Sequence, residues 1–120
     1  MQATILIAED DHLLSYLFQK ALTHAGYRTE VAWNGHEVMT RITAITPDIL
    51  LLDIGLPDVS GMQLLKNMRN YYPDMIIVVV TGNNNAMQSE ESQLADLFLL
   101  KPVSVRELVT LLGRLYQNTH

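Results

Sequence analysis

The sequence predicts an α/β fold, with a five-stranded parallel sheet covered by five helices. Short apolar runs alternate five times with stretches in which apolar residues recur every three or four positions, which is the helical period. The runs at 49–52 and 75–80 are apolar without a break, which is typical of strands that are buried on both faces. A parallel sheet with helices on both of its faces accounts for this alternation.

The first half of the chain holds the first three strands and two helices. The apolar runs at 4–8 and 49–52 and the alternating run at 28–32 predict strands. Apolar residues at helical spacing predict helices over 13–22 and 34–45. A glycine follows the first helix, and an asparagine with a glutamate three residues later marks the start of the second.

The second half continues the same order. A serine with a glutamine three residues later begins a helix over 60–68, which precedes the strand at 75–80. The polar stretch 83–93 has few apolar anchors and predicts a short or frayed helix. The run at 97–100 predicts the fifth strand, and a second serine capping box begins the last amphipathic helix, over 104–115.

The composition excludes several classes of protein. The 120 residues have the length of one domain, residues 1–120, which can bury a core without disulfides. A hydrophobic fraction of 48% with 18% charged residues excludes a disordered chain. The absence of cysteine excludes a disulfide scaffold, a Cys-ligated zinc site and a thiol nucleophile. Eight basic against 13 acidic residues, and no apolar run near the roughly 20 residues of a membrane span, lead us to expect a cytoplasmic protein without direct contact to nucleic acid or membrane.

The candidate functional residues stand at the ends of the predicted strands. They are Glu9, Asp10 and Asp11 after the first strand, Asp53 after the third, Thr81 after the fourth and Lys101 after the fifth. Ligands of open parallel sheets bind outside the carboxyl ends of the strands, so we expect these side chains to meet. Clustered carboxylates repel one another unless a cation lies among them, and oxygen ligands favour Mg²⁺. Since an aspartate can attack a phosphoryl group, the residues predict metal-assisted phosphoryl transfer onto an aspartate.

The same residues resemble the receiver domain of bacterial two-component response regulators. The resemblance runs from Thr4 to Leu115 and rests on motifs in a fixed order. These motifs are Ile5 to Asp11, Pro47 to Asp53 with Leu56-Pro57 and Gly61, Val79 to Gly82, and Lys101-Pro102. The resemblance implies a flavodoxin-like receiver fold, a doubly wound sheet of strand order 2-1-3-4-5 with five helices.

The resemblance also implies a role for each residue of the site. Asp53 is the implied phosphoacceptor. Thr81 and Lys101 are the residues implied to contact the phosphoryl oxygens. The resemblance implies a cis peptide bond between Lys101 and Pro102. It also implies that Phe98 occupies the aromatic switch position. The implied ligands of Mg²⁺ are Glu9, Asp10, Asp53 and the backbone carbonyl of Gly55. Such a domain catalyses its own phosphorylation and dephosphorylation and is not a conventional enzyme.

The resemblance implies two kinds of partner, one that phosphorylates the domain and one that responds to the phosphorylated form. A sensor histidine kinase or a phosphotransfer protein supplies the phosphoryl group. An effector protein or an output domain reads the surface made by the fourth helix, the fifth strand and the fifth helix, and a homodimer through this surface stays open. Because one receiver fold uses all 120 residues, we expect the output to lie on another chain or in a domain absent from this sequence.

Three features depart from the usual family pattern. Phe98 is more often tyrosine, so a switch at this position would act by packing without a hydroxyl. Gly55 stands where a bulkier side chain is common, which would leave the acceptor more open to water. The stretch 81–101 is short and has Gln93-Leu94-Ala95 where Ala-Gly-Ala is usual, so the departures concentrate around the fourth helix.

Two other functions fit parts of the sequence. A pseudo-receiver would bind partners without phosphoryl turnover, but such domains usually lack one of the acids, the threonine or the lysine that are all present here. A metal-dependent phosphatase of small molecules would use the same chemistry. It would be expected to have a second aspartate two residues after the nucleophile, where this chain has Gly55.

Overall fold

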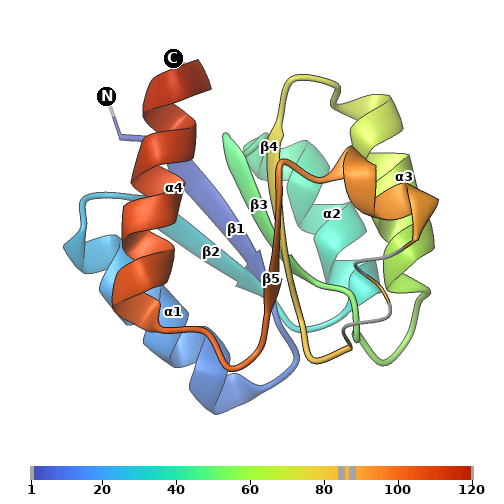
Figure 1. Ribbon diagram of the computed structural model, residues 1–120, viewed down its shortest axis with the longest axis horizontal. Coiled ribbons are helices and arrows are strands. Elements are labelled where there is room, and N and C mark those ends of the chain that lie inside the picture. The colour runs from blue at the N-terminus through green and yellow to red at the C-terminus, as the bar shows by residue number, and fades with distance from the viewer. Residues whose placement is uncertain (1, 84–85, 87–88, 120) are drawn as a thin grey trace.

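The computed structural model describes residues 2–83, 86 and 89–119 of the chain. In chain order the elements are β1 (Thr4–Ala8), α1 (His12–His24), β2 (Arg28–Ala32), α2 (Gly35–Ile45), β3 (Ile49–Asp53), α3 (Gly61–Tyr71), β4 (Ile76–Thr81), the 3-10 helix η2 (Glu90–Leu94), β5 (Leu97–Leu100) and α4 (Val105–Thr119). Both ends of the chain lie at the same end of the molecule, near where the strands begin (Figure 1). In this described part of the chain, no helix has the length and apolarity needed to cross a membrane.

All five strands lie parallel in one sheet of order β2-β1-β3-β4-β5, which confirms the predicted topology. Helices α1 and α4 pack on one face, and α2 and α3 pack on the other (Figure 1). Within β3, Leu50 and Leu52 belong to the core under α2 and α3, whereas Ile49 and Leu51 belong to the core under α1 and α4. Every residue of β3 and β4 is buried, which explains why these strands are apolar without alternation.

Side-chain caps fix where the α-helices begin. Four caps accept a hydrogen bond from the backbone N–H three residues later, at 2.8–3.3 Å: Asp11, Asn34, Ser60 and Ser104. In the reverse direction, Glu37 Oε1 accepts from the backbone N–H of Trp33 at 2.7 Å, one residue before the cap. The Asn34 and Glu37 pair therefore fixes the corner between β2 and α2 as well as the start of α2.

The sequence predicts five helices, and this prediction is wrong for the fourth helix, the one between β4 and β5. Between β4 and β5 the described residues form a 3-10 helix of 5 residues, η2, and no α-helix. Asn84, Asn85 and Met87, which fall in the predicted helix, lie outside the described residues. The physical reason is composition, because a stretch so rich in polar residues has little apolar surface with which a longer helix could pack. The described part of the chain contains four α-helices.

The side chain of Arg69, near the end of α3, contacts the segment that precedes β5. The guanidinium of Arg69 donates hydrogen bonds to the carbonyl oxygens of Met75 at 2.7 Å and Leu94 at 2.8 Å. It also pairs with Asp96 at 2.9 Å, and the same Asp96 oxygen accepts a hydrogen bond from the backbone N–H of Ile77 at 2.8 Å. These contacts hold the end of η2 and the start of β5 against α3.

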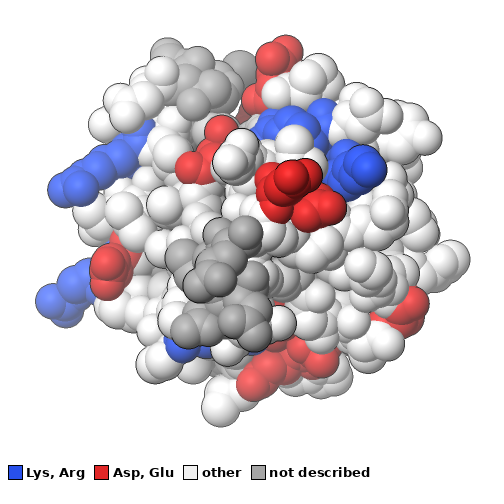
Figure 2. All heavy atoms as spheres, turned by 45° about the vertical axis from the view of Figure 1, so that its right-hand side comes forward, with Lys and Arg blue, Asp and Glu red and all other residues white. Residues whose placement is uncertain are grey.

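Charged side chains are spread over the face of the molecule that Figure 2 shows. Lys and Arg stand at separate places with acidic side chains among them, and most of the described surface in this view is uncharged. Binding to a nucleic-acid backbone needs clustered basic side chains. The described part of this face has no continuous basic surface of that kind.

Candidate functional site

Acidic residues meet where β1 and β3 end, at the point where the order of the strands reverses. Glu9 and Asp10 follow β1, and Asp53 is the last residue of the neighbouring strand β3. One carboxylate oxygen from each of the three residues lies within 4.8 Å of the others. The strand-end acids of the sequence therefore form one cluster at the carboxyl edge of the sheet, where open α/β folds bind their ligands.

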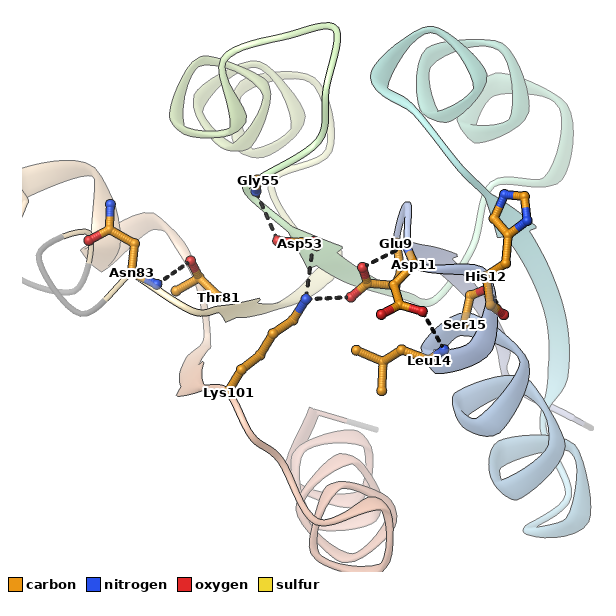
Figure 3. Close-up of polar contacts among 10 residues, drawn as sticks. All are labelled: Glu9, Asp11, His12, Leu14, Ser15, Asp53, Gly55, Thr81, Asn83 and Lys101. Atoms are coloured by element: carbon orange, nitrogen blue, oxygen red, sulfur yellow. Dashed lines mark hydrogen bonds and ion pairs between the residues drawn. The ribbon is translucent and has the colours of Figure 1, made fainter.

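Lys101 reaches this cluster from the end of β5 (Figure 3). Its Nζ lies 2.9 Å from Glu9 Oε1 and 3.3 Å from Asp53 Oδ2. The peptide bond to Pro102 is cis, as the family resemblance implied. Burial disfavours the charge on Lys101, but the hydrogen bond to Glu9 and the charges of Asp53 and Glu9 outweigh it and raise the pKa of the lysine. The ammonium group is therefore a permanent positive charge beside Asp53.

Glu9 is the most deeply buried acid of the cluster, with 2% of the residue exposed. Its Oε2 accepts a hydrogen bond from the backbone N–H of Asp11 at 3.1 Å. Its Oε1 is buried, and the partner of this oxygen is the ammonium group of Lys101, whose Nζ lies 2.9 Å away. Burial raises the pKa of Glu9 to about 7, and the charge of Asp53 adds to this effect. The cluster holds more negative charge than one lysine neutralises.

The donor set of the cluster fits a hard divalent cation. It consists of carboxylate oxygens from Glu9, Asp10 and Asp53. Glu9 Oε1 is buried and has Lys101 as its partner at 2.9 Å, and a cation would balance the negative charge that the lysine leaves. Gly55 lies beside the cluster, because its backbone N–H donates to Asp53 Oδ1 at 2.8 Å. A Cβ at position 55 would stand 3.3 Å from the same oxygen, so glycine leaves this side of the carboxylate open.

Two further residues named from the sequence occupy different surroundings. Thr81 ends β4 at the carboxyl edge of the sheet and is buried, and its hydroxyl oxygen accepts a hydrogen bond from the backbone N–H of Asn83 at 3.1 Å (Figure 3). Phe98 lies inside β5, opposite Val79, and packs against the core under α2 and α3. Thr81 thus stands at the acidic edge, and Phe98 lies deeper in the sheet.

Two contacts near the cluster were not predicted from the sequence. Trp33, which the sequence indicates only as a packing or interface residue, stacks on His12 with ring centroids 4.4 Å apart, and its indole N–H donates to Ser15 Oγ at 3.4 Å. Asp58, in the loop after β3, accepts hydrogen bonds from two successive backbone N–H groups at the start of α2, at 2.7 and 3.0 Å. The first contact has a signal in the sequence. Trp33 follows β2 and His12 follows β1, and these neighbouring parallel strands bring their carboxyl ends together.

A sequence profile described as the response regulator receiver domain matches residues 5–113. The chain belongs to the response regulator receiver domain family. The DNA-binding transcriptional regulator NtrC of Klebsiella pneumoniae is 34% identical to this receiver domain over an alignment of 110 residues that covers 90% of this chain and 24% of NtrC. The transcriptional regulatory protein TrcR of Mycobacterium tuberculosis is 34% identical over an alignment of 122 residues, gaps included, that covers 97% of this chain and 46% of TrcR. The chain thus spans about a quarter to a half of the length of these curated relatives.

Solved receiver domains share the fold. A CheY-like response regulator receiver domain protein from Methanospirillum hungatei has a TM-score of 0.90 at 28% identity, over 99% of this chain and 97% of that one. The response regulator protein TrrA from Thermotoga maritima, solved in complex with Mg²⁺-BeF, has a TM-score of 0.88 at 26% identity, over 96% of this chain and 99% of that one. These likenesses confirm the predicted α/β receiver fold, which is the CheY-like fold of these solved structures.

Proposed function

We propose that this receiver domain is a phosphorylation-controlled switch of a two-component or phosphorelay system, with Asp53 as the phosphoacceptor. The observation that supports the proposal is the cluster at the sheet edge. Asp53 lies within 4.8 Å of Glu9 and Asp10, and 3.3 Å from Lys101. A carboxylate nucleophile, a set of cation ligands and a fixed ammonium group are the parts that phosphoryl transfer to an aspartate needs.

We further propose that Glu9, Asp10, Asp53 and the backbone carbonyl of Gly55 hold Mg²⁺. Mg²⁺ prefers oxygen ligands and keeps several positions for water or phosphate oxygens. The solved Mg²⁺-BeF complex of TrrA, whose fold this chain shares, supports the choice of ion. When bound, the ion supplies positive charge that stabilises the oxygens of the transferred phosphoryl group.

In the proposed transfer, a carboxylate oxygen of Asp53 attacks the phosphorus of a phosphohistidine on the partner. The phosphorus–nitrogen bond breaks, and its electron pair leaves with the imidazole ring, so the product is an aspartyl phosphate. Lys101 then pairs with one phosphoryl oxygen, and the hydroxyl of Thr81 donates a hydrogen bond to another. Attack by water later releases phosphate and restores Asp53. Both reactions occur on the domain itself, which distinguishes it from a conventional enzyme.

The proposed switch reaches the surface through Thr81 and Phe98. Movement of the Thr81 hydroxyl toward the phosphoryl group leaves space beside β5 into which Phe98 repacks, and the surface of η2, β5 and α4 changes as a result. We propose that the domain works in the cytoplasm. A sensor histidine kinase or phosphotransfer protein is the proposed donor, and an effector protein or output domain is the proposed reader of this surface. The names of the relatives NtrC and TrcR, both regulators of transcription, support an output domain.

A pseudo-receiver without phosphoryl turnover is the less favoured function. It would need no nucleophile, no cation ligands and no lysine directed at them. This chain has all three in contact at one edge of the sheet.

The proposal is tested by incubating the protein with acetyl phosphate and Mg²⁺ and measuring its intact mass. The wild-type protein should gain the mass of one phosphoryl group, and removal of the metal with EDTA should prevent the gain. Asp53→Asn should gain nothing. Asp74→Asn removes an exposed acid at the opposite end of the sheet and should behave as the wild type. An equal gain in Asp53→Asn would overturn the assignment of the acceptor, and no gain in the wild type would favour the pseudo-receiver.

A further inference from the structure

We propose that the corner between β2 and α2, residues 32–35, is a positioning element for the metal site. The corner contributes no carboxylate to the cluster. It contacts the loop after β1, which carries Glu9 and Asp10, and the loop that directly follows Asp53 at the end of β3. This inference rests on the proposed function, because it assigns residues that fix the geometry of the proposed Mg²⁺ ligands.

The first contact holds the loop that follows Asp53. Asp58 Oδ1 accepts a hydrogen bond from the backbone N–H of Gly35 at 2.7 Å, and Oδ2 accepts one from that of His36 at 3.0 Å. These bonds lie at the N-terminal end of α2, where the helix dipole favours a negative charge. The Gly35 N–H is the main cause that lowers the pKa of Asp58 below its ordinary value. The exposed Asp58 carboxylate thus ties the loop to a helix that starts 23 residues earlier in the sequence.

Two glycines let the same loop pack closely. A Cβ at Gly35 would collide with the side chain of Val59, and a Cβ at Gly61 would collide with the backbone of Ile54. The last part of the loop therefore packs closely against the start of α2. The two ends of the loop, at Ile54 and Gly61, also lie close to each other. Gly55, whose carbonyl is the proposed backbone ligand, lies between these two contacts.

The second contact holds the loop that follows β1. The backbone N–H of Glu9 donates to the carbonyl of Ala32 at 3.0 Å. Trp33 stacks on His12 at a centroid distance of 4.4 Å, and its indole N–H reaches Ser15 at 3.4 Å. Figure 3 shows His12 and Ser15 at the start of α1, beside Glu9. The corner thus supports the segment that carries Glu9 and Asp10.

A magnesium site depends on this kind of support. Mg²⁺ tolerates little deviation from octahedral geometry, and its proposed ligands here come from the loop after β1, the end of β3 and the loop after β3. Loops that are held in place before the ion arrives avoid the entropic cost of ordering them on binding. Removal of contacts that orient metal ligands typically weakens metal affinity by about 10- to 100-fold. Because Asp58 touches backbone and no ligand, we expect its effect to lie at the lower end of this range.

The test compares Mg²⁺ affinity in Asp58→Ala, Asp58→Asn and two control variants. The affinity is measured by titration of Trp33 fluorescence, and separately by the rise in thermal unfolding temperature that Mg²⁺ causes. Asp74→Ala removes an exposed acid away from the cluster and controls for charge. Arg69→Ala removes the contacts of α3 to Leu94 and Asp96 and controls for loss of stability. Asp58→Ala should bind Mg²⁺ about tenfold more weakly, Asp58→Asn should be intermediate, and both controls should stay within about twofold of the wild type.

The outcomes separate this inference from the proposed function. Equal affinities in Asp58→Ala and the two controls overturn the inference, whether all are unchanged or all are weakened. A wild-type protein that responds to Mg²⁺ in neither measurement overturns the proposed metal site itself, and the inference with it. A loss confined to the Asp58 variants supports the role of the corner.

Discussion

Replacement of Glu9 by glutamine is expected to stabilise the metal-free domain at neutral and alkaline pH. Burial raises the pKa of Glu9 from 4.5 to about 7 in the folded chain. Between these two values the folded chain keeps a proton that the unfolded chain has already lost, so stability falls as the pH rises. Glutamine has nearly the same shape and no charge to bury, so the variant avoids this loss.

The size of the effect follows from the two pKa values of Glu9. One pKa unit corresponds to about 1.4 kcal/mol, so ionisation of Glu9 costs the fold about 3 kcal/mol once it is complete, above a pH of about 7. By linkage, about 2 kcal/mol of this cost develops between about pH 5.5 and 8. The free energy of unfolding of a domain is only about 5–15 kcal/mol, so the change is readily measured. Bound Mg²⁺ should remove much of the difference, because the cation offsets the buried charge.

The measurement is urea unfolding followed by circular dichroism in EDTA, at several pH values over this range. Glu90→Gln removes an exposed acid of η2 and should keep the pH dependence of the wild type. Glu9→Gln should gain stability relative to the wild type as the pH rises. If the difference in unfolding free energy between Glu9→Gln and the wild type is the same at both ends of the range, burial does not control the ionisation of Glu9 and the reasoning is refuted.

Three further changes test other parts of the structure. Lys101→Ala should slow phosphorylation by acetyl phosphate about 100-fold, because it removes the ammonium group 3.3 Å from Asp53; an unchanged rate would exclude the lysine from the transfer. Arg69→Ala should lower the unfolding free energy in urea by about 2–3 kcal/mol, since it breaks the pair with Asp96 and removes the guanidinium donor from the part-buried carbonyls of Met75 and Leu94. An unshifted urea midpoint would contradict this. Asp58→Asn should lower the thermal stability at neutral pH, because the ionised form of Asp58 stabilises the fold. Since the pKa of Asp58 is lowered in the folded chain, this difference should shrink as the pH falls below about 4 and disappear only below the lowered pKa. A difference in melting temperature that persists at acid pH would show that the charge of Asp58 is not responsible.

Much of the fold could be predicted because its signals are local. The apolar runs that became β3 and β4 are buried on both faces, and such a run leaves few alternatives to a central parallel strand. The caps at Asn34, Ser60 and Ser104 are likewise short patterns that act on the next turn of chain. The segment before β5 has no such periodic pattern, and there the predicted helix proved to be the short 3-10 helix η2.

The site could be predicted in outline but not in its electrostatics. The acids stand at strand ends, and parallel strands bring their carboxyl ends to one edge, so the meeting of Glu9, Asp10 and Asp53 follows from topology. The raised pKa of Glu9 depends on how deeply the residue is buried, which no local pattern encodes. The bond of Asp58 to Gly35 joins residues 23 positions apart, and a pair so distant is visible only in three dimensions.

The position of the chain ends offers a use for this domain as a sensor. Both ends lie where the strands begin, whereas Asp53 and Lys101 lie where strands finish. A fluorescent protein or a surface tether fused at either end would therefore stand away from the acidic edge. Such a fusion could report the phosphorylation state, or immobilise the domain for binding measurements, while leaving the proposed acceptor accessible to its donor.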